Sequence, residues 1–210
     1  MEKRFTILFA ALLLCVVCFA QPKEEKAVRK SFEQYKKALL DENGAKAALW
    51  VDRQTIGYYQ QVLLWVKEAD SAQTDALPLL DKLMVFSVRH RTPHEDILSF
   101  DAKALFAYAV EKGMVGKGSV AGNSLGTLRI QNDQAEGQLI SQGNPTSFYF
   151  TFHKEEGRWK LNLTRIFPLA EPALRQSVTD SEMEENAYFF YILELLTGEK
   201  PGPDIWQPVK

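Results

Sequence analysis

Titratable side chains that could move protons gather most densely in a stretch that begins at His90. His94 and Asp96 are near enough in the chain to form a general acid and base pair. His90 and His94 also have the i, i+4 spacing of metal ligands on one helix face. Pro93 lies between them and ends one helix before the next begins, so we expect no metal site here. Glu95 is explained as a helix-capping residue, and a structural helix junction is the simpler interpretation.

A second set of residues could form an apolar binding site. Phe148, Phe150 and Phe152 alternate along one predicted strand, so their side chains share a face, and Trp159 in the following strand belongs to the same face. This face either lines a cavity for a small apolar ligand or fills the core, and the core is the simpler interpretation. His153 alternates to the opposite face, where we expect it to contact solvent.

The composition and the motifs that the sequence lacks argue against cofactor and nucleic-acid binding. The sequence contains no phosphate-binding glycine loop, no HExxH zinc motif, no CxxC pair and no Gly-x-Ser-x-Gly elbow, so we predict no cofactor. When the three charged residues among the first twenty are set aside, 23 basic and 26 acidic residues remain, with a formal charge of −3. That balance provides no positive field for nucleic acid, so no nucleic-acid partner is expected.

The first twenty residues are typical of an export signal. A basic start precedes an apolar run over residues 5–19, and small residues before Gln21 indicate cleavage at that point. The run is shorter than the roughly 20 residues of a spanning helix, so we predict no membrane span after cleavage. Both cysteines lie in this segment, which leaves no disulfide beyond it. The protein is therefore predicted to be exported, periplasmic or secreted, with an uncleaved anchor and a lipoprotein as alternatives.

The remaining chain is predicted to form one α+β domain over residues 21–197, followed by a proline-rich tail over residues 198–210. Apolar residues at helical spacing predict helices over residues 24–40, 45–51, 53–69, 75–88 and 102–112, and a last helix that ends near residue 197. Alternating patterns predict strands over residues 123–131, 135–141, 146–154 and 158–166. We expect N-terminal helices packed on a curved antiparallel sheet of about four strands, with a C-terminal helix.

Local signals predict where several of these helices begin and end. Asp52 is a candidate N-cap for the helix over residues 53–69, and Ser99 or Asp101 for the helix over residues 102–112. Thr92 and Ser181 each open a capping-box pattern. Asn43 and Gly44 suit a left-handed cap that ends the first helix. Residues 71–75 are polar and are predicted to form a loop. The tail is expected to lie extended along the body or to be mobile.

Three stretches together resemble the nuclear transport factor two-like superfamily, a cone-shaped α+β fold. They are the end of the first helix, Ala-Leu-Leu-Asp-Glu-Asn-Gly at residues 38–44; the segment Val-Asp-Arg-Gln-Thr-Ile-Gly-Tyr-Tyr at residues 51–59; and the final hairpin, which leads into Gly-Arg-Trp-Lys-Leu at residues 157–161. The resemblance covers residues 24–69 and 122–166. It implies that residues 76–112 are a helical insertion.

The resemblance also implies roles for single residues. Catalytic members of the superfamily often place an aspartate with a tyrosine or histidine in the cone, which adds Asp52 and Tyr58 to His94 and Asp96 as acid/base candidates. Tyr59 would line the cone beside the strand aromatics. Asp52 is equally well explained as an N-cap, and the two tyrosines as part of the core. Dimerisation through the sheet is common in the superfamily, so a homodimer is a further expectation.

Three functions follow from these observations. The preferred hypothesis is an exported, non-catalytic domain that binds a small apolar ligand or a protein partner, such as an envelope protein. The first alternative is a small cofactor-independent isomerase, dehydratase or cyclase that uses an acid/base pair in the cone. The second alternative is a structural, envelope-associated interaction protein. The superfamily contains both enzymes and binding domains, so fold alone does not decide among the three.

Overall fold

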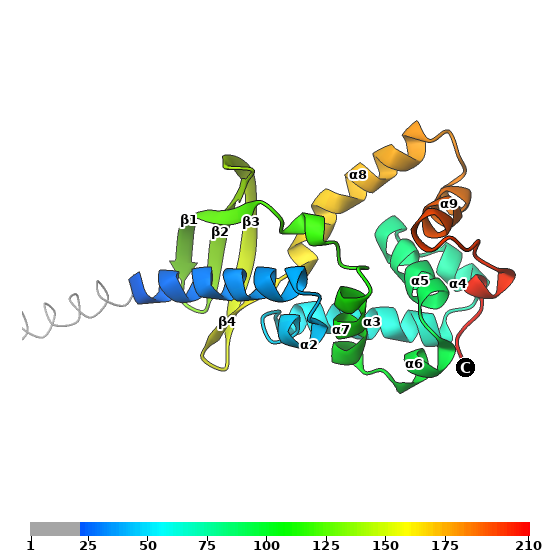
Figure 1. Ribbon diagram of the computed structural model, residues 1–210, viewed down its shortest axis with the longest axis horizontal. Coiled ribbons are helices and arrows are strands. Elements are labelled where there is room, and N and C mark those ends of the chain that lie inside the picture. The colour runs from blue at the N-terminus through cyan, green and yellow to red at the C-terminus, as the bar shows by residue number, and fades with distance from the viewer. Residues whose placement is uncertain (1–21) are drawn as a thin grey trace, which may run out of the picture.

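The computed structural model describes residues 22–210, and the predicted export signal lies outside them. The described chain has an α+β fold, as predicted, with helices before and after a four-stranded antiparallel sheet. Figure 1 shows the sheet at one end of the molecule and most of the helices at the other. Within residues 22–210, no helix is both long and apolar enough to cross a membrane.

The sheet is a meander in which the strands lie in sequence order. Its strands are β1 (Asn123–Gln131), β2 (Gln134–Ser141), β3 (Asn144–Glu155) and β4 (Arg158–Asn162). Glu156 and Gly157 in the last turn have φ angles of 52° and 75°, the geometry whose twist matches paired strands. The register places Phe152 opposite Ala135 on one side and Leu161 on the other. The predicted apolar face is therefore continuous across β2, β3 and β4.

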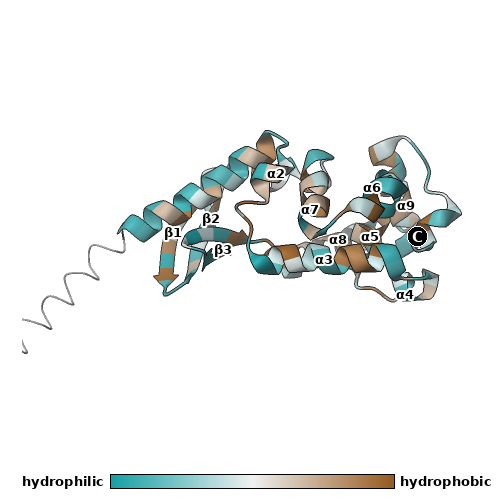
Figure 2. Cartoon of the chain, turned by 90° about the horizontal axis from the view of Figure 1, so that it is seen from below, coloured by the Kyte–Doolittle hydropathy of each residue, from teal (hydrophilic) through white to brown (hydrophobic). Residues whose placement is uncertain are grey.

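The first helix, residues 22–40, covers the aromatic face of the sheet. Its apolar residues at helical spacing are at most 1% exposed, as the pattern predicted: Val28, Phe32, Tyr35 and Leu39. The Phe32 ring lies 5.3 Å from that of Phe150. Arg29 Nη2 donates to the Gly126 carbonyl at 2.7 Å and so ties the helix to the edge strand β1. Hydrophilic residues occupy much of the face of this helix that is visible in Figure 2.

The other helices extend from the edge of the sheet, where the helix from Arg53 starts beside β4, to the far end of the molecule (Figure 1). They are α2 (Gly44–Ala47), α3 (Arg53–Glu68), α4 (Ser71–Asp75), α5 (Leu79–Arg91), α6 (His94–Ser99), α7 (Ala102–Glu111), α8 (Phe167–Asp180) and α9 (Glu185–Thr197). Phe86 of α5 and Phe189 of α9 anchor a second apolar cluster there. The tail after Gly198 packs on this end: Ile205 and Val209 are each 3% exposed, and Val209 N donates to the Val66 carbonyl at 3.1 Å.

Some predicted helix ends are correct and others are wrong. Asp52 and Asp101 cap α3 and α7 as N-cap residues, each accepting from a backbone N–H at 2.8 Å. Residues 71–75 form a helix rather than a loop, because Asp70 makes a capping box with Gln73. Ser181 ends α8 instead of beginning α9.

The junction at residues 92–94 and the end of the first helix also depart from prediction. The Thr92 hydroxyl makes no cap, and its oxygen is buried without a hydrogen-bond partner in the described structure. Glu42, with a φ of 53°, is the left-handed residue after the first helix. Asn43 instead caps α2, which begins at Gly44. Capping types alone do not show which of two adjacent helices a residue serves.

Candidate functional site

Two polar features lie at the sheet end of the molecule, one on each face of the β3–β4 hairpin. The first is a contact between Asp52, just before α3, and His153 of β3. Asp52 Oδ2 lies 2.7 Å from His153 Nδ1, and the Asp52 side chain is 0% exposed. The His153 side chain is 27% exposed. His153, which we predicted to contact solvent, therefore also contacts the buried carboxylate of Asp52.

The surroundings of this pair explain its geometry. Asp52 N donates to the Leu161 carbonyl at 3.0 Å, which fixes the start of α3 beside β4. The other carboxylate oxygen, Oδ1, accepts from Thr55 N at 2.8 Å as the helix N-cap. Asn162 is also fully buried, and its Nδ2 donates to Gln54 Oε1 at 2.6 Å. The buried side chains of Asp52 and Asn162 thus each have a hydrogen-bond partner within the fold.

This arrangement has a definite chemical meaning for the imidazole. When Nδ1 donates its proton to a carboxylate, the lone pair of the neutral ring lies on Nε2. No hydrogen bond joins His153 Nε2 to another residue in the described chain, and the ring is partly exposed. A buried carboxylate behind an open Nε2 is the arrangement that orients a histidine as a general base. The same contacts also fasten α3 to β3, so the pair has a structural role in either case.

The other acid/base candidates lie away from this pair. His94 and Asp96 belong to α6, which packs near the far end of α3, where Lys67 Nζ donates to the Leu98 carbonyl at 3.2 Å. A 16-residue helix is about 24 Å long, so Asp52 is far from both. Within residues 22–210, no group of three or more metal-ligating side chains could hold a metal ion.

Tyr58 has its own partner. Its hydroxyl donates to Asp81 Oδ1 at 2.9 Å. Burial raises the pKa of Tyr58 well above the usual value of a phenol, and burial also raises the pKa of Asp81. Tyr58 is thus a hydrogen-bond donor between α3 and α5, and it does not meet His94 or Asp96.

The aromatic residues predicted to bind a ligand are mostly buried. Phe152 is 0% exposed, Trp159 2%, Tyr59 3% and Phe150 4%, whereas Phe148 is half-buried. A side chain with no accessible area borders no space large enough for water. Phe32 of the first helix packs against Phe150, so this aromatic face is part of the core, and a ligand there requires the helix to move away. The ligand-binding role of these residues stays a prediction.

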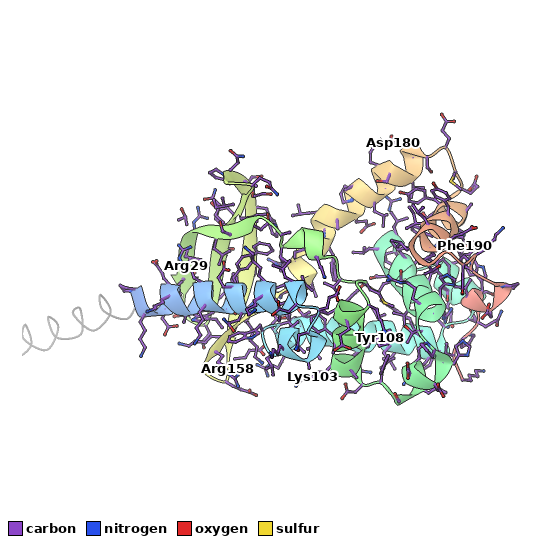
Figure 3. The ribbon with its side chains drawn as sticks, in the orientation of Figure 1. Arg29, Lys103, Tyr108, Arg158, Asp180 and Phe190 are labelled. Carbon is purple, nitrogen blue, oxygen red and sulfur yellow. The ribbon has the colours of Figure 1, made fainter. Side chains whose placement is uncertain are left out.

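The second polar feature is a cleft between the first helix and the β3–β4 hairpin, with a volume of about 430 Å³. Its walls come from the helix start, the segment before α3 and the hairpin end: Lys23, Glu24, Ala27, Lys30, Trp50, Lys154, Gly157, Arg158 and Trp159. Figure 3 shows Arg158 at the tip of the hairpin. Trp50 is half-buried and offers flat apolar surface to the cleft, whereas Trp159 is only 2% exposed and lies beneath the Lys154 ammonium. The cleft thus combines one aromatic wall with a charged rim.

The cleft is positively charged, although the whole chain carries a formal charge of −2. Its four cations face one carboxylate, Glu24, which accepts from Lys154 Nζ at 2.8 Å and from Trp159 Nε1 at 2.6 Å. Hydrogen bonds from these two partners lower the pKa of Glu24, and the charge of Lys23 adds to the effect. In the described structure, Lys23, Lys30 and Arg158 form no ion pair with an acidic residue.

No local pattern in the sequence predicts this cleft. Its cations are spread over positions more than 120 residues apart, and each resembles an ordinary surface lysine or arginine. One signal was available: the register of the hairpin pairs Lys154 with Trp159, which brings a cation and an indole together on one face. His153 was missed for a similar reason, since its partner Asp52 lies 101 residues earlier.

Comparisons with known proteins found no matching family model, curated protein or solved structure. The resemblance to the nuclear transport factor two-like superfamily therefore stays a prediction.

Proposed function

We propose that this protein is an exported, non-catalytic binding domain that holds a small anionic molecule with a flat apolar part. The ligand lies in the cleft between the first helix and the β3–β4 hairpin. The observation that carries this proposal is a cleft that gathers the half-buried Trp50 and three cations that form no ion pair in the described structure, in a chain that is acidic overall. A volume of about 430 Å³ is within the usual range for small-molecule sites.

Each part of the cleft has a role in this proposal. Lys30 and Arg158 attract and pair with a carboxylate, sulfonate or phosphate group. Trp50, which is half-buried, packs against the flat part of the ligand. Glu24 holds Lys154 over the Trp159 ring, where the ammonium lies 5.7 Å from the ring centre. A purely apolar ligand is disfavoured, because it would take these charges out of water without a partner.

Naphthalene-2-sulfonate is a suitable probe, with neutral naphthalene-2-methanol as its matched control. We expect quenching or shift of tryptophan fluorescence by the sulfonate and at least about tenfold weaker binding of the alcohol, the worth of one charge-assisted contact. Lys30→Glu with Arg158→Glu should weaken sulfonate binding by about tenfold or more, while Lys103→Glu on α7 should not. Glu24→Gln should strengthen it. Equal binding of both probes, or unchanged binding in the double variant, would refute the proposal.

A second candidate function is favoured by the contact between Asp52 and His153. In it the protein is a small cofactor-independent enzyme of the isomerase, dehydratase or cyclase kind. His153 Nε2 would accept a proton from the substrate, and the Asp52 carboxylate would stabilise the imidazolium that forms. This proposal replaces the predicted partners Tyr58, His94 and Asp96 with a histidine that the fold brings to Asp52.

The reactivity of the three histidines tests the second candidate. We expect His153→Gln to remove most of the imidazole-catalysed hydrolysis of p-nitrophenyl acetate, while His90→Gln and His94→Gln remove little. Asp52→Asn should keep the N-cap, because asparagine caps helices as well as aspartate does. Its amide would then donate to Nδ1 and move the ring proton to Nε2, so the rate should fall by about tenfold or more without loss of folding. Equal losses for all three histidine variants would rule out an activated His153.

A further inference from the structure

One helix of this protein is apolar on nearly every side, yet only part of it is covered. Residues 187–196 of α9 are Ala-Tyr-Phe-Phe-Tyr-Ile-Leu-Glu-Leu-Leu, with one charged residue among ten. Only Phe189 and Leu193 are buried in the described structure, where they pack toward α5. A helix with apolar residues all round is normally buried on all sides. Packing against α5 thus explains why the inner face of α9 is apolar. Nothing in the described structure covers the apolar residues of the outer face.

The outer face is a continuous apolar stripe, which we call the α9 stripe. Tyr191 is 51% exposed, Leu195 69% and Leu196 61%, and Met183 just before the helix is 39% exposed. Tyr191 and Leu195 are one helical turn apart, so their side chains are neighbours on the same face. Figure 1 places α9 at the end of the molecule opposite the sheet, well away from the cleft.

Acidic residues surround the α9 stripe. Residues 180–200 contain six acidic residues and one basic residue, a formal charge of −5 in a chain of net −2. Among them, Glu182, Glu184 and Glu194 are exposed and form no ion pair in the described structure. Asp180, labelled in Figure 3 at the end of α8, is also exposed and accepts a hydrogen bond from Gln176 of its own helix. An apolar stripe with an acidic rim requires a partner with an apolar stripe and a basic rim.

We infer that the α9 stripe is the docking site for a basic amphipathic helix of a partner protein. Such a helix lays its apolar side along Tyr191, Leu195 and Leu196, as two helices pack through ridges and grooves. Its lysine or arginine residues pair with Glu184, the residue before α9, and with Glu194 near the end of the helix. The charge pattern disfavours a second copy of this chain, because a two-fold interface would bring the same carboxylates together. It disfavours an anionic membrane surface for the same reason.

The test uses two designed peptides of about 18 residues with the same leucine stripe. One has lysine and the other glutamate at all remaining positions. We expect the lysine peptide to bind the whole protein at least about tenfold more tightly than the glutamate peptide, measured by fluorescence anisotropy, with affinity that falls as salt rises. Tyr191→Ser with Leu195→Ser should weaken that binding by about tenfold or more. Leu98→Ser, which changes an exposed leucine on α6, is the matched control and should leave it unchanged.

A charge variant separates docking from attraction to any acidic surface. Glu184→Gln with Glu194→Gln should lower affinity and flatten the salt dependence, while the exchange Glu171→Gln on α8 should do neither. Binding of the lysine peptide that survives Tyr191→Ser with Leu195→Ser would overturn the inference. A concentration-dependent dimer that Leu195→Ser dissolves would assign the stripe to a second copy instead. Binding to phosphatidylglycerol vesicles that the same variant abolishes would assign it to a membrane.

Discussion

Replacement of Arg89 by methionine is expected to lower the free energy of unfolding by about 3 kcal/mol or more, a large part of the stability of an ordinary domain. Arg89 of α5 is only 6% exposed and has no carboxylate partner in the described structure. Its guanidinium donates instead to four backbone carbonyls and one hydroxyl, those of Trp65, Val66, Ala69, Ile205 and Thr74. Three of these carbonyls end α3, where the helix dipole is negative.

The physical reason for the large effect is that methionine fills the volume but removes the donors to the Ala69 and Ile205 carbonyls. The Trp65 and Val66 carbonyls keep backbone donors but lose the charged group that faces them at the end of α3. Burial lowers the pKa of Arg89 to about 10, so the side chain is still charged at neutral pH. Urea unfolding followed by circular dichroism measures the loss. Arg91→Met is the matched control, because the Arg91 side chain donates one hydrogen bond in the described structure, to the Lys112 carbonyl, and its removal should cost less than about 1 kcal/mol. Equal unfolding midpoints for the two variants would contradict the role assigned to Arg89.

Gly44→Ala is expected to destabilise the protein by about 3 kcal/mol, through steric overlap rather than backbone conformation. A Cβ at position 44 would lie 2.0 Å from the Ala107 carbonyl oxygen and 2.5 Å from the Ala107 Cα. These are backbone atoms of α7, so the whole of α2 or α7 must shift to make room. The close approach of α2 to α7 therefore depends on the missing side chain at Gly44.

Gly57 provides the matched control for this prediction. It lies inside α3, is exposed, and has no atom within 4 Å of the Cβ that alanine would add. Gly57→Ala should raise the free energy of unfolding by about 0.5–1 kcal/mol, because alanine favours the helix and restricts the unfolded chain. Thermal unfolding of both variants gives the comparison. A Gly44→Ala variant as stable as the Gly57→Ala variant would mean that α2 and α7 do not pack as described.

Features that depend on neighbouring residues were largely readable from the sequence. The apolar spacing of the first helix, the alternation of β3 and the N-caps at Asp52 and Asp101 all involve residues within one or two turns of each other. The predicted N-caps at Thr92 and Ser181 were wrong, although they too were predicted from neighbouring residues. Each lies between two helices, and residue type alone does not show which helix end it serves.

The candidate sites depended on contacts that no local pattern contains. The sequence pointed to Asp52 but not to His153, because strand alternation gives the face of a side chain and not what covers that face. It pointed to the aromatic residues of β3 but not to the first helix filling the space beside them at Phe32. The cleft cations were invisible for the same reason, since Lys30 and Arg158 meet only when the hairpin folds beside the first helix.

By itself, then, the sequence determined the α+β class, the order of helices and strands, and which side chains share a face, because these follow from periodicity and local capping. The tertiary structure alone decided that Asp52 meets His153, that Arg89 closes the end of α3, that Gly44 lies against α7 and that the α9 stripe is uncovered. Each of these contacts joins elements that are far apart in the chain. Its energy depends on distances and angles in the folded protein, which residue type alone does not specify.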